Sequence, residues 1–127
     1  MPRRVKAQNI VIIEDDSEIG QSLDFYFNAH NTVQVFASAE EALADENKLA
    51  GADVFIIDYK LPGKNGVDLF NYLKTRIPAA KYILITGEMS YDLAEKTREL
   101  GLDALILKPF DFTILEDNIS ALTTVVA

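Results

Sequence analysis

The sequence predicts an α/β doubly wound fold, in which a five-stranded parallel sheet carries helices on both faces. Three observations support this fold class. Five short apolar runs recur along the chain, residues with helical spacing fill the stretches between them, and glycine or proline falls in the connections. A regular alternation of strands and helices favours parallel pairing, because two parallel strands need a long crossover connection.

The expected strands are short runs rich in β-branched side chains. Four of the five are apolar almost throughout, which is typical of strands buried on both faces of a parallel sheet. The second run is the exception, because it contains the polar residue Gln34. In chain order the runs cover residues 10–13, 33–36, 54–57, 82–85 and 104–107.

A helix is expected after each strand, because apolar residues recur there at intervals of three and four. Asp111 precedes the last of these stretches and is a suitable N-cap, since its carboxylate can accept hydrogen bonds from the first helical turn. The pattern is carried, helix by helix, by Ile19, Leu23, Tyr26 and Phe27, by Ala39, Ala42 and Leu43, by Leu69, Leu73 and Ile77, by Tyr91, Ala94 and residues 97–100, and by Ile114, Leu115, Ile119 and Leu122.

Length and composition limit the classes of function. The chain of 127 residues is 49% hydrophobic and fits one domain, residues 1–127, with residues 1–7 as a flexible tail. It contains no cysteine, which excludes disulfides, zinc–thiolate sites and cysteine nucleophiles. The formal net charge of -8 argues against direct binding of nucleic acid. No apolar run is long enough for a membrane span, so we expect no membrane partner and a cytoplasmic location.

Acidic residues follow two of the expected strands. Glu14 and Asp15 end the first strand, and Asp58 ends the third. If these strands are neighbours, carboxylates about 5 Å apart repel each other by roughly 3 kcal/mol at an effective dielectric constant of about 20, so the group would raise a pKa or hold a cation. Magnesium fits, because it binds one or two carboxylates together with carbonyl and water oxygens. Solvated acids at strand ends are the simpler interpretation of the same residues.

Two further polar residues end the remaining strands. Thr86 follows the fourth run, and Lys108 follows the fifth. A hydroxyl and an ammonium group beside a metal-bound carboxylate supply the donors and the charge that a transferring phosphoryl group needs. Each residue alone has an ordinary explanation, in local hydrogen bonding or in a solvated turn. Their joint placement at one edge of the sheet indicates phosphoryl chemistry.

The segments IVIIEDD, FIIDYKLPGKNG, ILITGE and ALILKPF resemble, in order and spacing, the motifs of response-regulator receiver domains of two-component signalling. The resemblance covers nearly the whole chain and implies the flavodoxin-like strand order 2-1-3-4-5. It implies that Asp58 is the phosphorylated residue, that Thr86 is the switch hydroxyl and that Lys108 is the lysine of the site. The implied ligands of Mg2+ are Glu14, Asp15, Asp58 and the backbone carbonyl of Lys60.

The resemblance also implies a phosphoacceptor signalling switch and not a turnover enzyme. Asp58 would receive a phosphoryl group from a sensor histidine kinase or a phosphotransfer protein, and the acyl phosphate would later hydrolyse slowly. The changed surface would then bind an effector protein or an output domain, or form a phosphorylation-dependent dimer.

Three further positions lie near these site residues in the sequence. Leu105 stands three residues before Lys108, where receiver domains commonly carry tyrosine or phenylalanine. We therefore expect no aromatic flip there and interpret Leu105 as strand packing. Lys60 and Glu88 are each two residues beyond a site residue, and we expect them to face each other across the mouth of the site and to prolong the life of the acyl phosphate. Two independently solvated side chains are the alternative.

Other classes of protein fit less well. A phosphatase of the haloacid-dehalogenase type would need an acid two residues after the nucleophile, where this chain has Lys60. A flavodoxin-like electron carrier would need a loop rich in hydroxyl groups and glycine after the first strand, where this chain has acids. A pseudo-receiver that docks proteins without being phosphorylated stays open as the alternative function. His30, the one histidine, cannot supply a metal cluster, and the aromatic residues 25–27 are interpreted mostly as core.

Overall fold

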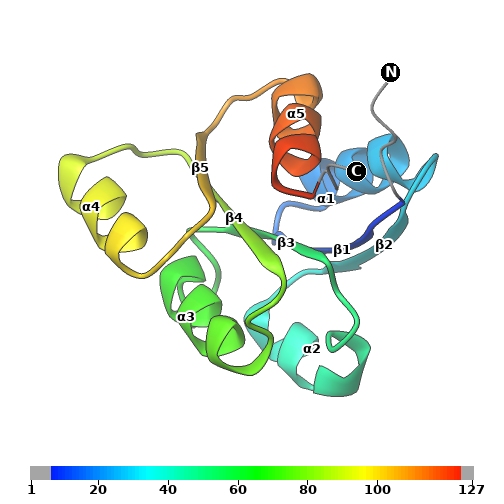
Figure 1. Ribbon diagram of the computed structural model, residues 1–127, viewed down its shortest axis with the longest axis horizontal. Helices are drawn as coiled ribbons and strands as arrows, with labels where there is room; N and C mark the ends of the chain where they lie inside the picture. Colours follow the sequence, from blue (N-terminus) through cyan, green and yellow to red (C-terminus); the bar gives the residue numbers. More distant parts are fainter. Residues whose placement is uncertain (1–6, 124–127) are drawn as a thin grey trace.

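The computed structural model describes residues 7–123, and its five strands form one parallel sheet in the order β2-β1-β3-β4-β5 (Figure 1). The predicted fold class and strand order are confirmed. The predicted tail at residues 1–7 lies outside the described residues, except for Ala7. Each predicted run lies within one observed strand, and the strands are β1 (Asn9–Ile13), β2 (Thr32–Phe36), β3 (Val54–Asp58), β4 (Lys81–Thr86) and β5 (Ala104–Leu107).

Helices cover both faces of the sheet, as burial of the strands requires. One face carries α1 (Ser17–Asn28) and α5 (Phe112–Thr123) (Figure 1). The other face carries α2 (Ala39–Leu43), α3 (Gly66–Arg76) and α4 (Tyr91–Glu99). A short 3-10 helix, η1 (Glu46–Lys48), was not predicted. Among residues 7–123 no helix has the length and apolar character to cross a bilayer, and the cytoplasmic location stays a prediction.

Side-chain caps set where four of the helices begin. Asp16, Ser38, Asn65 and Ser90 stand directly before α1, α2, α3 and α4, and each accepts a hydrogen bond from a backbone N–H of the first turn. Such caps satisfy donors that the helix itself leaves unpaired. Asp111 stands in the corresponding place before α5, where its backbone carbonyl accepts the N–H of Ile114 at 3.1 Å.

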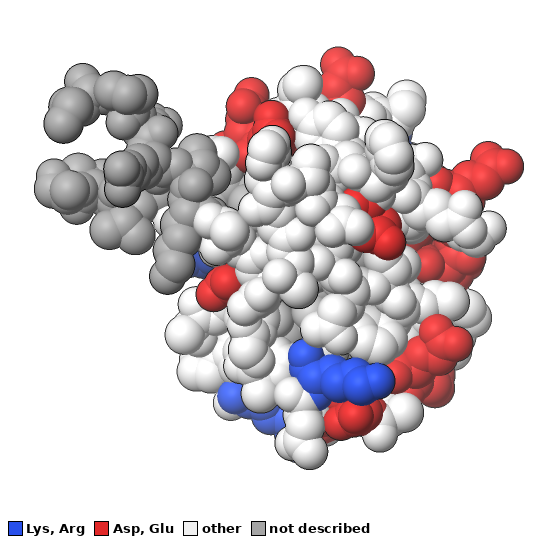
Figure 2. Space-filling model, turned by 90° about the vertical axis from the view of Figure 1, so that its right-hand side faces the viewer, with Lys and Arg blue, Asp and Glu red and all other residues white. Residues whose placement is uncertain are grey.

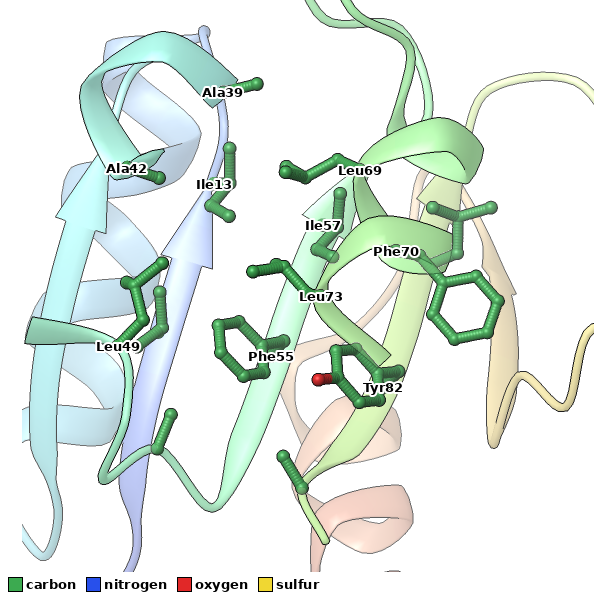
Figure 3. Packing of buried hydrophobic residues seen from close by; sticks show 14 of the residues in the cluster. Ile13, Ala39, Ala42, Leu49, Phe55, Ile57, Leu69, Phe70, Leu73 and Tyr82 are labelled. Atoms are coloured by element: carbon green, nitrogen blue, oxygen red, sulfur yellow. The ribbon is translucent and has the colours of Figure 1, made fainter. Parts of the chain in front are cut away.

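Alternate strand residues point to opposite faces of the sheet and pack into two cores. Phe55 and Tyr82 face the side of α2 and α3, whereas Ile56 and Ile83 face the side of α1 and α5. Figure 3 shows the first core, in which the rings of Phe55 and Tyr82 stack with their centroids 5.0 Å apart. The Tyr82 hydroxyl donates to the Ile77 carbonyl at 2.7 Å, so the polar end of this buried ring is satisfied. Burial on both faces holds the central strands in register and thereby positions the residues at their carboxyl ends.

Candidate functional site

Three carboxylates meet at the carboxyl edge of the sheet. β1 and β3 pair in parallel with Ile13 opposite Ile57, so Glu14 and Asp58, which follow them, come from neighbouring strand ends. Glu14, Asp15 and Asp58 each offer an oxygen, and these atoms all lie within 4.8 Å of one another. Glu14 and Asp58 are buried, whereas Asp15 is exposed. The structure therefore brings the three predicted acids together, with one of them open to solvent.

Lys108 reaches across the edge from the end of β5 and pairs with two of these acids. Its Nζ lies 3.1 Å from Glu14 Oε1 and 3.2 Å from Asp58 Oδ2. Its backbone N–H donates to the Thr86 carbonyl at 2.7 Å, which holds the start of the loop after β5. Burial would lower the pKa of Lys108, but the hydrogen bonds and Coulomb attraction from Glu14 and Asp58 outweigh it and hold the pKa above its ordinary value. The ammonium group therefore stays charged at neutral pH.

The ionised form of the Glu14 side chain is destabilised by this crowding. Burial and the neighbouring Asp58 raise the pKa of the Glu14 carboxyl to about 8, and Lys108 offsets them only in part. Within the described part of the chain, the buried Oε2 atom of Glu14 has no hydrogen-bond partner. A buried carboxylate oxygen without a partner, beside two further carboxylates, suits a hard divalent cation that takes oxygen ligands. The residues therefore fit the Mg2+ that the resemblance implies, with Glu14, Asp15 and Asp58 able to hold it.

Thr86 is buried at the end of β4, and the loop that follows engages its hydroxyl. Thr86 Oγ1 donates to the Glu88 carbonyl at 2.8 Å and accepts the Glu88 N–H at 3.1 Å. The Glu88 carboxylate accepts a hydrogen bond from Lys60 Nζ at 2.7 Å, which raises the pKa of Lys60 and lowers that of Glu88. The predicted meeting of Lys60 and Glu88 is confirmed. The hydrogen bonds between the Thr86 hydroxyl and the Glu88 backbone were not predicted.

A close backbone approach at Gly66 holds the loop between β3 and α3 against the site. The Gly66 N–H donates to the Tyr59 carbonyl at 2.8 Å. A Cβ atom at this position would collide with the Asp58 carbonyl oxygen, so only glycine fits here without a backbone shift. This contact positions the segment from Asp58 to Lys60, whose carbonyl stays the predicted further ligand.

Two further predictions from the sequence concern Leu105 and the aromatic residues of α1. Leu105 is half-buried on β5 and packs against the core on the α3 side, as predicted for a strand-packing residue. The aromatic residues of α1 differ among themselves: Phe27 is buried, Tyr26 is half-buried and Phe25 is 87% exposed. The expectation that these residues are mostly core is therefore confirmed, and Phe25 is the exception. His30 is exposed beyond the end of α1.

A hollow of about 530 Å³ opens beside Lys108, between α1 and the loop that joins β5 to α5. A second depression continues along α1 to the exposed Phe25. The hollow was not predicted from the sequence, although two phenylalanines of the segment KPFDF could have indicated it. The lining residues of the hollow are Glu18, Ile19, Ser22, Lys108, Pro109, Phe110 and Phe112.

The helices around this hollow carry acidic charge. Lys and Arg are absent from residues 7–47 and from α5, whereas acidic residues occur in both segments. Figure 2 views the molecule from the side on which β2 lies in Figure 1. Acidic side chains lie around much of the edge of that face, and Lys and Arg gather in its lower part. Lys108 is the basic residue among those that line the hollow.

The fold and the cluster define a class of protein: a doubly wound α/β domain with grouped acids and a lysine at the carboxyl edge of its sheet. The family model of the response regulator receiver domain matches residues 10–120. The chain therefore belongs to the family of response regulator receiver domains, and the resemblance is confirmed. Membership of this family supports phosphoacceptor signalling in a two-component system.

Curated relatives and solved structures agree with this assignment. Transcriptional regulatory protein MalR of Bacillus subtilis is 28% identical over 118 residues, which cover 88% of this chain and 48% of MalR. Sporulation initiation phosphotransferase F of the same organism is 26% identical over 113 residues, covering 88% of this chain and 90% of that protein. The structure of the BeF3-activated DrrB receiver domain matches with a TM-score of 0.83 at 25% identity, over 91% of this chain and 96% of that one. DrrB is a Thermotoga maritima protein. This chain spans less than half the length of the first curated relatives.

Proposed function

We propose that residues 1–127 act as one receiver domain that takes a phosphoryl group on Asp58 from a phosphohistidine of a sensor histidine kinase or a phosphotransfer protein. One observation carries the proposal: the Lys108 ammonium lies 3.2 Å from the Asp58 carboxylate, inside a group of acids that fits a divalent cation. A structural ion pair alone gives no reason for Glu14 and Asp15 to stand beside it, because they add repulsion.

Asp58 supplies the nucleophile. One of its carboxylate oxygens forms a bond to phosphorus while the phosphorus–nitrogen bond of the donor breaks and its electron pair leaves with the donor imidazole. Lys108, which its raised pKa keeps charged, neutralises negative charge on the phosphoryl oxygens. Held by Glu14, Asp15, Asp58 and the Lys60 carbonyl, Mg2+ would add to this neutralisation and orient the same oxygens. The acyl phosphate later hydrolyses, so the domain is a switch and not a turnover enzyme.

Phosphorylation changes the surface of the domain through Thr86. Its hydroxyl leaves the Glu88 carbonyl for the phosphoryl group, and the loop after β4 moves with it. Because Leu105 supplies no aromatic side chain, we assign the change of surface to this loop and to α4. The recipient of the signal is an effector protein, an output domain or a second phosphorylated copy of the chain.

We assign the hollow beside Lys108 to the protein phosphodonor. The hollow is apolar through Ile19, Phe110 and Phe112, and it adjoins the exposed Phe25. Since α1 and α5 carry acidic residues and neither Lys nor Arg, the fitting partner is a helix whose apolar stripe is flanked by basic side chains.

A single substitution separates protein docking from the chemistry. Phe25→Ala should slow transfer from a phosphohistidine protein and leave labelling by acetyl phosphate unchanged, because the small donor needs no docking surface. Tyr91→Ala removes another exposed aromatic side chain, on α4, and is the matched control. Equal slowing with both donors, or equal slowing in both variants, would contradict the assignment of the hollow.

Mass spectrometry after incubation with acetyl phosphate and Mg2+ tests the proposed function itself. We expect the mass gain of one phosphoryl group, which maps to Asp58 and is absent from Asp58→Asn and from samples with EDTA. A gain that persists in Asp58→Asn would contradict the assigned acceptor. No gain at all would favour the pseudo-receiver, which docks proteins without being phosphorylated.

A further inference from the structure

The two loops that border Asp58 are joined at a single residue, Glu88. Its backbone holds the Thr86 hydroxyl, which donates to the Glu88 carbonyl at 2.8 Å and accepts the Glu88 N–H at 3.1 Å. Its side chain accepts a hydrogen bond at 2.7 Å from Nζ of Lys60, which belongs to the loop after β3. A movement of Glu88 therefore affects both contacts.

The Thr86 hydroxyl has one proton to donate. While that proton is bonded to the Glu88 carbonyl, the hydroxyl cannot donate to a group bound at Asp58. Thr86 is 1% exposed, so its hydroxyl has little access to water. If the hydroxyl turns toward Asp58, it can keep accepting the Glu88 N–H only when Glu88 moves with it. The ion pair with Lys60 opposes that movement, because it ties Glu88 to the opposite loop.

We propose that the Lys60–Glu88 ion pair is a latch that keeps the Thr86 hydroxyl on Glu88 and thereby weakens the affinity of the site for a phosphoryl group. The latch rests on the proposed function and adds a form of regulation to it. Glu88 is a positioning residue, since it acts through Thr86. The side chains of Lys60 and Glu88 are 70% and 71% exposed, so the latch is weak and sensitive to salt.

Binding of beryllium fluoride in the presence of Mg2+ measures the latch without the complication of phosphate hydrolysis. Titration calorimetry on the full chain at low salt gives the affinity. We expect Glu88→Gln and Lys60→Gln each to raise it by about two- to five-fold, the range that an exposed ion pair can supply. The double variant should add nothing further. At about 1 M salt, where the ion pair is screened, the affinities of the unvaried chain and of the variants should no longer differ.

The directions in which the two single variants change the affinity for beryllium fluoride distinguish the latch from simple charge attraction. Direct Coulomb interaction with the anion would move them in opposite directions, because one variant removes a negative charge and the other removes a positive charge. A latch that acts through Thr86 moves both in the same direction, and the gain disappears when Thr86→Val is combined with either variant. Glu95→Gln, which breaks the surface pair of Glu95 with Arg98 at 2.8 Å on α4, is the control and should leave the affinity unchanged.

Different outcomes would overturn the latch and the proposed function. Opposite shifts, no shift, or a gain that persists in the Thr86→Val background would overturn the latch while beryllium fluoride still binds. No binding of beryllium fluoride to the unvaried chain would overturn the proposed function and the latch together.

Discussion

The crowded carboxyl of Glu14 should make the metal-free protein less stable as the pH rises. Its pKa is about 8 in the folded chain, against an ordinary value of 4.5. Between these values the folded state keeps a proton that the unfolded state has released, so the free energy of unfolding decreases with increasing pH. Below the lower value both states are protonated and the loss is absent. Above the higher value both states are ionised and the loss is complete.

The size of the effect follows from the pKa difference. Each pKa unit corresponds to about 1.4 kcal/mol, so we expect a loss on the order of 3 kcal/mol between about pH 5 and pH 8. This expected loss is smaller than the pKa difference multiplied by the energy per pKa unit, because the site relaxes around an ionised Glu14. In a domain of 127 residues, a loss of this size lowers the melting temperature by roughly 10 °C.

Thermal and urea unfolding in EDTA over this pH range measures the slope. Glu14→Gln is the reference, because it removes the titrating carboxyl, and the difference between the two curves isolates Glu14 from the other titrating groups. Mg2+ should flatten the difference, since binding of the metal displaces the proton. The reasoning would be refuted if the difference in unfolding free energy between the two proteins did not change with pH. It would also be refuted if the unvaried chain became more stable than Glu14→Gln as the pH rises.

Three further predictions address the surroundings of the site. In EDTA at about pH 8, Asp58→Asn should melt at a higher temperature than the unvaried chain, because it removes one of the charges that crowd Glu14; a lower melting temperature would count against this account. Mg2+ should raise the melting temperature of the unvaried chain by mass action, and Asp15→Ala should remove most of that gain; a titration to tens of millimolar without effect would contradict an acidic metal pocket. Gly66→Ala should lower both the melting temperature and the extent of labelling at Asp58, because its Cβ collides with the Asp58 carbonyl, and the control Gly51→Ala, which meets no neighbour, should change neither.

Local pattern was enough to predict the fold class and to select candidate residues for the site, whereas the strand order and the role of each residue were implied by the family resemblance. Residues 10–13, 54–57 and 82–85 are apolar throughout because their strands are buried on both faces, and such a run is readable without knowledge of its neighbours. In a parallel sheet the carboxyl ends of the strands share one edge. Polar residues directly after the strands, such as Glu14 and Asp58, could therefore be predicted to meet.

Contacts between distant segments set the properties that local pattern could not reveal. The bond from Lys108 to Glu14 joins residues 94 positions apart, and the raised pKa of Glu14 depends on burial and charges contributed by three strands. The direction of the Thr86 hydroxyl depends on the path of the loop after β4, which no periodicity encodes. Phe25 could not be told from its aromatic neighbours by composition, because a helix that packs on one face can bury only part of three consecutive residues. Hydrogen bonds, side-chain burial and electrostatic shifts are all determined by which atoms lie nearby in space, and that proximity arises only when the chain has folded.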